Sequence, residues 1–140
     1  MSVRNNYFEA DKVFVYGTLK SSERMADALS GEHRFGDFQT PPIFTMRAGS
    51  FPMLFLNEKK GHSVLGELYT CSPETLARLD QYEGYPSFYT RKKLPVAGCV
   101  TGIQFDAWIY YIDDDEWAYS QYNKVFPDPD THFLEWTAAR

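Results

Sequence analysis

The sequence is poor in several residue types, and each shortage excludes a class of protein. Only two of the 140 residues are cysteine, too few for a disulfide framework. Lysine and arginine number 14 against 19 aspartates and glutamates, and the net charge of −5 argues against a nucleic-acid-binding surface. No apolar run approaches the roughly 18 residues of a membrane helix. The first residues also lack the apolar stretch of a signal peptide.

These shortages favour a cytoplasmic protein with reduced thiols at Cys71 and Cys99. The histidines, His33, His62 and His132, are widely spaced and do not group with the cysteines, so we expect no metal site. The glycine after the first apolar run fits neither the dinucleotide fingerprint nor the phosphate loop. We therefore expect no metal and no organic cofactor, and neither nucleic acid nor membrane as a partner.

Aromatic residues, in contrast, are abundant. Ten Tyr, 11 Phe and 3 Trp make up 17% of the chain. With 44% hydrophobic and 24% charged residues, the composition is that of a soluble globular protein. The length corresponds to one domain, expected to span residues 1–140. Such large side chains can fill a core or line a pocket.

Short apolar runs separated by turn signals predict a fold rich in β-strands. Residues 12–16 are apolar and β-branched and precede Gly17, which is typical of a buried strand. Because the strands and helices do not alternate regularly, a doubly wound α/β fold is disfavoured. We predict an α+β protein, with a mixed, partly closed sheet and a few short helices packed on it. Further strands are expected within residues 43–46, 51–56, 64–71, 88–96 and 103–112.

One helix is marked clearly at both ends. Ser72 is a good N-cap, Pro73 suits the first helical position, and Gly84 suits a left-handed stop. Leu76 and Leu79 supply its apolar stripe. Two shorter helices are expected, one after Ser21 or Ser22 and one over residues 131–138.

The turn after the first predicted strand is one candidate site. It consists of Tyr16, Gly17, Thr18 and Leu19. Such a turn can expose successive backbone N–H groups to a carboxylate or a developing oxyanion. Gly17 lets a ligand approach the backbone closely. The alternative is an ordinary connection between a strand and a helix.

Glu83, at the predicted end of the helix, is the second candidate. Aromatic neighbours would desolvate its carboxyl group, and the negative end of the helix dipole would act in the same direction. We therefore expect a raised pKa that suits proton transfer near neutral pH. Two alternatives stay open: Glu83 is an exposed residue before a helix stop, or Arg91 pairs with a carboxylate here and lowers its pKa.

Together these two segments resemble the γ-glutamyl cyclotransferase superfamily, and most of all its AIG2-like and γ-glutamylamine cyclotransferase branch. The likeness is carried by Tyr16-Gly17-Thr18-Leu19 and by Glu83-Gly84-Tyr85-Pro86 with Tyr89 and Arg91 behind it. Gly66-Glu67-Leu68-Tyr69 resembles a family strand, and Ser50-Phe51-Pro52-Met53 a segment that lines the glutamyl site. The resemblance covers roughly residues 12–112, and residues 113–140 are left unassigned.

The resemblance implies a small mixed β-barrel carrying helices, and an intramolecular reaction. The α-amine of a γ-glutamyl amide attacks its own γ-carbonyl, which forms 5-oxoproline and releases an amine. Glu83 corresponds to the catalytic acid/base. The residues expected to bind the substrate are Tyr16, Gly17, Thr18, Leu19, Pro52, Tyr89 and Tyr111. Aromatic side chains are expected to form a dry wall around Glu83, namely Tyr16, Tyr82, Tyr85, Phe88 and Tyr89.

Two other functions are compatible with the same residues. One is a binding or regulatory module that keeps the fold without turnover. The other is an enzyme that removes a γ-glutamyl protecting group from a biosynthetic product by the same chemistry. In each case the expected partner is a small γ-glutamyl molecule, and the chain is expected to be a monomer or a dimer. The sequence does not predict which amine leaves, because the loops that would recognise it vary.

Overall fold

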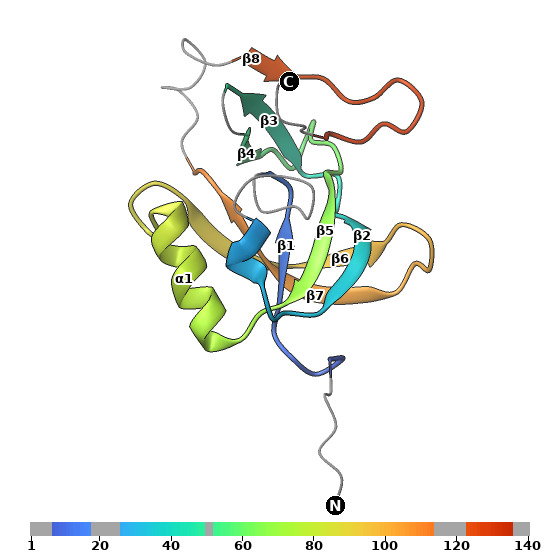
Figure 1. Cartoon of the computed structure of the whole chain (residues 1–140). Coiled ribbons are helices and arrows are strands. Elements are labelled where there is room, and N and C mark those ends of the chain that lie inside the picture. Colours follow the sequence, from blue (N-terminus) through green and yellow to red (C-terminus); the bar gives the residue numbers. More distant parts are fainter. Residues whose placement is uncertain (1–6, 18–25, 50–51, 114–122, 136–140) are drawn as a thin grey trace, which may run out of the picture.

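The computed structural model describes residues 7–17, 26–49, 52–113 and 123–135 (Figure 1). These ranges contain eight strands, one α-helix and one 3₁₀-helix. The helices are η1 (Ala26–Leu29) and α1 (Pro73–Glu83). The strands are β1 (Lys12–Val15), β2 (Arg34–Gln39), β3 (Phe44–Ala48), β4 (Pro52–Leu56), β5 (Leu65–Thr70), β6 (Thr90–Gly98), β7 (Gln104–Tyr111) and β8 (Asn123–Val125).

Five strands close into a barrel in the order β1-β5-β2-β6-β7. The barrel closes where β1 runs parallel to β7, with Val13 opposite Trp108, and its other pairs are antiparallel. A second sheet, β4-β3-β8, lies beyond one end of the barrel, and α1 lies along its side (Figure 1). The predicted α+β fold with a mixed, closed sheet and short helices is confirmed. Closure also removes the exposed strand edges that promote aggregation.

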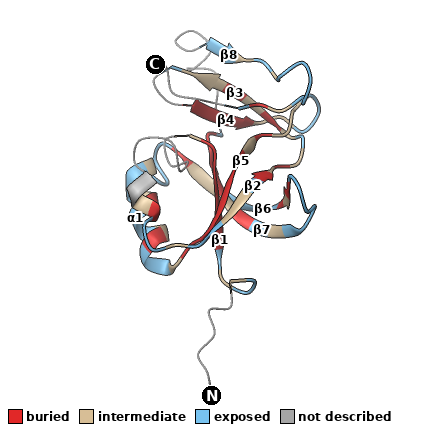
Figure 2. Cartoon of the chain, turned by 45° about the vertical axis from the view of Figure 1, so that its right-hand side comes forward, coloured by how far each residue is buried: buried red, intermediate tan, exposed pale blue. Residues whose placement is uncertain are grey.

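The alternation of side chains along each strand builds two hydrophobic clusters. Phe14 and Tyr16 belong to a cluster that includes Ile109 and Tyr111 of the neighbouring strand β7. Val13 and Val15 belong to the second cluster, together with Leu79 of α1. Figure 2 shows this arrangement as red along β1 and on one face only of α1. The barrel therefore has an apolar interior and an apolar outer face that α1 covers.

The ends of α1 form as the sequence predicts. The Oγ of Ser72 accepts a hydrogen bond from the Thr75 backbone N–H at 3.2 Å, which caps the first turn. Gly84 has φ 68°, the left-handed conformation of a C-terminal stop, and its N–H donates to the Gln81 carbonyl at 3.3 Å. The carboxylate of Glu32 also accepts from the Ser72 N–H at 3.0 Å, which ties this end of the helix to the turn after η1.

One predicted helix needs correction, and two strands were not predicted. The helix predicted over residues 131–138 is wrong where the structure describes it, because Leu134 forms a bridge with Val64 and exchanges backbone hydrogen bonds with Ser63 and Leu65. Strand β2 was not predicted as a separate strand, since Gly36 (φ 120°) interrupts its pattern at a register shift. Strand β8 lies in the segment that the sequence left unassigned. The helix start at Ser21 or Ser22 lies outside the described residues.

Cys71 and Cys99 are both free in the structure; Cys71 is buried and Cys99 is exposed. Burial raises the pKa of the Cys71 thiol to about 12, and the nearby carboxylates of Glu32, Asp11 and Asp80 add to this shift. Among the described helices, none is long and apolar enough to cross a membrane.

The N-cap of α1 provides a test of this local account. Ser72→Ala removes the hydroxyl that accepts from the Thr75 N–H, and we expect a loss of about 1 kcal/mol in the free energy of unfolding, measured by urea denaturation. Ser87→Ala is the matched control, because this serine is exposed in the turn after α1. Equal stability of the two variants would contradict the capping role.

Candidate active site

Glu83 is the last residue of α1, and its side chain is partly buried against the barrel. Desolvation by this burial raises the pKa of its carboxyl group to about 7, from the ordinary value of 4.5. The raised pKa expected from the sequence is confirmed, with burial as its cause. A carboxyl group that titrates near neutral pH can both accept and return a proton.

Two tyrosines on the barrel interact electrostatically with Glu83. They are Tyr16, directly after β1, and Tyr110 of β7. The Tyr16 hydroxyl donates to the Tyr110 carbonyl at 2.6 Å, which joins the end of β1 to β7. Burial, then the neighbouring Tyr89 and Glu83, raise the pKa of Tyr16 well above its ordinary value. The Tyr16 hydroxyl therefore stays protonated and neutral near Glu83.

Tyr89 joins the same region from the start of β6. It is 5% exposed, and its hydroxyl donates to the Pro52 carbonyl at 2.6 Å. Pro52 in turn lies against the glycine turn, because a Cβ atom on Gly17 would approach Pro52 Cγ to 2.7 Å. The structure thus brings together Tyr16, Gly17, Pro52 and Tyr89 from the predicted site. Thr18 and Leu19 lie outside the described residues.

The residues of the expected aromatic wall differ in burial. Tyr16 and Tyr89 are buried, but Tyr82, Tyr85 and Phe88 are 41%, 36% and 40% exposed. These three lie where α1 ends and its connection to β6 begins, and their shielding of the Glu83 carboxyl group stays a prediction. Tyr110, which the sequence reasoning passed over, also interacts with Glu83. Its role depends on strand register, which local sequence patterns do not reveal.

Tyr111 faces the other side of its strand. It belongs to the hydrophobic cluster inside the barrel, together with Tyr16. Burial, and then the charge of Asp113, raise the pKa of its hydroxyl. Its contact with a substrate remains a prediction.

The alternative in which Arg91 pairs with a carboxylate is realised, but the carboxylate is Asp80. Arg91 Nε and Nη2 donate to the two oxygens of Asp80 at 2.7 and 3.0 Å. Burial acts to raise the pKa of Asp80, yet hydrogen bonds from Arg91 and Tyr110 outweigh it and hold the pKa below its usual value. Desolvation by burial shifts the pKa of Glu83 in the opposite direction. One helix thus carries two carboxylates with opposite protonation behaviour.

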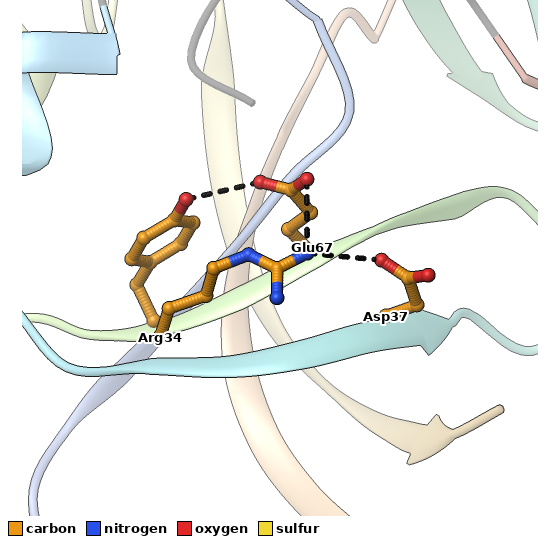
Figure 3. A network of polar contacts seen from close by, with 4 residues as sticks. Arg34, Asp37 and Glu67 are labelled. Carbon is orange, nitrogen blue, oxygen red and sulfur yellow. Dashed lines mark hydrogen bonds and ion pairs between the residues drawn. The ribbon is translucent and has the colours of Figure 1, made fainter. Parts of the chain in front are cut away.

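A third carboxylate, Glu67, is engaged in ionic contacts on the outer face of the barrel (Figure 3). Arg34 Nη2 lies 3.2 Å from Glu67 and 3.2 Å from Asp37, and the Tyr69 hydroxyl donates to Glu67 at 3.0 Å. Glu67 lies opposite Val15 in the barrel, at the end of β1 that leads into the glycine turn. This network joins β2 to β5 and holds Glu67 in ionic contacts, whereas Glu83 has the raised pKa that suits proton transfer.

Comparison with known proteins identifies the family. The family model described as γ-glutamyl cyclotransferase, AIG2-like, matches residues 13–130. The chain belongs to this family. The match extends beyond residue 112, where the resemblance read from the sequence ends, and includes β8.

Individual relatives agree with this assignment. A rat γ-glutamylaminecyclotransferase is 28% identical over 140 aligned residues, which cover 89% of this chain and 94% of the relative. A Methanocaldococcus jannaschii protein, named only as a candidate γ-glutamylcyclotransferase, is 33% identical over 100 residues, with 71% and 82% covered. The crystal structure of an AIG2-like protein from Mus musculus superposes with a TM-score of 0.70 at 27% identity, covering 94% of this chain and 99% of that one.

The pKa of Glu83 predicts a specific dependence of stability on pH. The folded state holds this proton up to about pH 7 and the unfolded state only to about 4.5, so stability is lost as the pH rises through this window. Glu83→Gln cannot ionise and escapes the loss. We expect its unfolding free energy, relative to the parent, to increase by about 3 kcal/mol between pH 4.5 and 8. Parallel curves for parent and variant, measured by urea denaturation, would contradict the shift.

Proposed function

We propose that this protein is a γ-glutamyl cyclotransferase that acts on γ-glutamylamines, with Glu83 as general acid/base. The observation that carries the proposal is a partly buried carboxyl group, with a pKa near 7, that interacts with the hydroxyls of Tyr16 and Tyr110. Family membership supports the type of reaction. Similarity to the rat γ-glutamylaminecyclotransferase supports the substrate class.

The reaction needs a proton acceptor because the nucleophile is an amine. An α-amino group has a pKa near 8 and is mostly protonated at pH 7, so it must lose a proton before it attacks. Its nitrogen then forms a bond to the γ-carbonyl carbon of the same molecule, and the amide C–N bond breaks. The attacking nitrogen gives up one proton before the attack and a second as the lactam N–H forms, and the leaving nitrogen gains two and departs as an ammonium ion. In this proposal Glu83 accepts these protons in turn and delivers them to the leaving nitrogen. The chain gains and loses no atoms, and no covalent enzyme intermediate is required.

Positioning supplies the remaining rate acceleration. The amine and carbonyl are already part of one molecule, so holding them in ring-closing geometry uses the high effective molarity of intramolecular reactions. In this proposal the turn at Gly17 holds the γ-glutamyl group through its backbone N–H groups, which also stabilise the oxyanion. The close packing of Gly17 on Pro52, and the hydrogen bond from the Tyr89 hydroxyl to the Pro52 carbonyl, support a fixed position for Gly17. The free thiols suit a cytoplasmic location.

The decisive experiment is Glu83→Gln, assayed for release of 5-oxoproline from γ-glutamyl-ε-lysine. We expect kcat to fall by about 10²–10⁴-fold while the fold is kept, because the amide cannot accept the proton. Glu74→Gln is the matched control, since this glutamate is exposed in the first turn of the same helix. In the parent, kcat should decline below about pH 7 as Glu83 becomes protonated.

The outcomes separate the alternatives. Turnover of Glu83→Gln at the parental rate would show that Glu83 is not the acid/base. Binding of γ-glutamyl compounds by the parent, without 5-oxoproline release from any of a panel of them, would favour a non-catalytic binding module.

A further inference from the structure

Asp80 connects three elements of the fold through a single carboxylate. It lies on α1, one turn before Glu83. It accepts two hydrogen bonds from Arg91 of β6, at 2.7 and 3.0 Å, and one from the Tyr110 hydroxyl of β7 at 2.7 Å. Arg91 and Tyr110 are themselves opposite one another across β6 and β7. The bonds are short and charge-assisted, which makes them the strongest kind of side-chain contact available here.

Arg91 also contacts the chain on the other side of Glu83. Its guanidinium lies 4.3 Å from the Tyr85 ring centroid and 4.4 Å from that of Trp108. The Tyr85 backbone N–H donates to the Asp80 carbonyl at 2.8 Å. One side chain of β6 therefore holds Asp80 before Glu83 and Tyr85 after it, so the backbone on both sides of Glu83 is fixed to the barrel.

The same contacts keep the positive charge of Arg91 away from Glu83. The phenol of Tyr110 interacts with both Arg91 and Glu83, so the two charges share one neighbourhood. The carboxylate that binds Arg91 is Asp80, whose hydrogen bonds raise the pKa of the guanidinium. Titratable groups from several elements lie in this region: Tyr16 after β1 and Tyr110 of β7 interact with Glu83, and Tyr89, before β6, acts on Tyr16. Arg91 of β6 pairs with Asp80 on the same helix as Glu83.

We propose that Asp80 is a positioning residue for Glu83. By binding Arg91 and Tyr110, its carboxylate holds the end of α1 in place and prevents the guanidinium from pairing with Glu83. The catalytic consequence rests on the proposed function, whereas the effect on the titration of Glu83 does not.

The test is Asp80→Asn, which leaves the size of the side chain unchanged and removes its charge. Arg91 then loses its carboxylate partner, and Glu83 becomes the acidic group within its neighbourhood. We expect kcat for 5-oxoproline release to fall at least tenfold, with a smaller change in KM. We also expect the acidic limb of the kcat profile to move down by about one pH unit, because a nearby cation favours the ionised carboxyl group.

Two further variants separate positioning from a general loss of structure. Asp11→Asn is the control, because it removes an exposed ion pair of the same strand, between Asp11 and Lys93 of β6 (3.2 Å). We expect this variant to keep the parental kcat and the parental pH profile. The double variant Asp80→Asn with Arg91→Gln carries no unpaired charge and remains measurable if the single variant does not fold. Its acidic limb should return to that of the parent, while kcat stays at least tenfold low.

A readout without turnover keeps the two proposals distinguishable. ¹³C NMR of labelled glutamate carboxyl groups, assigned for Glu83 through Glu83→Gln, follows the titration directly. We expect Glu83 to titrate about one pH unit lower in Asp80→Asn than in the parent. The same titration midpoint in both proteins, or a double variant with the kcat of the parent, would overturn the positioning role. An inactive parent that still shows the NMR shift would overturn the proposed function alone.

Discussion

The packing of α1 on the outer face of the barrel is the constraint on which the site depends. Leu79 is completely buried in the cluster that contains Val13 and Val15 of β1 and Tyr110 of β7. A fully buried leucine is worth about 1.5–3 kcal/mol in transfer free energy alone, which is comparable with a charge-assisted hydrogen bond at the site. Because this contact fixes the rotation of the helix, Glu83, one turn further on, is carried to the barrel beside Tyr16.

The barrel strands have two buried faces, one toward the interior of the barrel and one toward α1. Alternate residues of β1 and β7 fill the interior or support the helix, so the interior packing and the position of the helix cannot vary independently. Tyr16 continues the interior series of β1 and ends with its hydroxyl on the carbonyl of Tyr110. The chain directly after β1 is thereby attached at Tyr16 to β7, a strand that packs against the helix.

Two carboxyl groups near the end of α1 have pKa values shifted in opposite directions, one by pairing and the other by burial. Asp80 is surrounded by donors and stays ionised, whereas desolvation makes ionisation of Glu83 costly. Pairs of carboxylates whose surroundings separate their pKa values are a recurring feature of sites that transfer protons. Here the separation depends on which carboxylate Arg91 reaches, and that depends on the register between β6 and β7.

Local chemistry in the sequence was enough to determine α1, β1 and the position of Glu83. Capping by Ser72, the left-handed stop at Gly84 and the apolar run of β1 act over a few residues, so their effects can be read without the fold. The surroundings of Glu83 were decided by tertiary structure. Three contacts show this: Tyr110 interacts with Glu83, Arg91 pairs with Asp80, and Leu134 forms a bridge in place of a helix. Each joins residues that are distant in sequence or that strand register brings together. Such contacts depend on how strands pair and on which surfaces become buried, and these are properties of the whole chain.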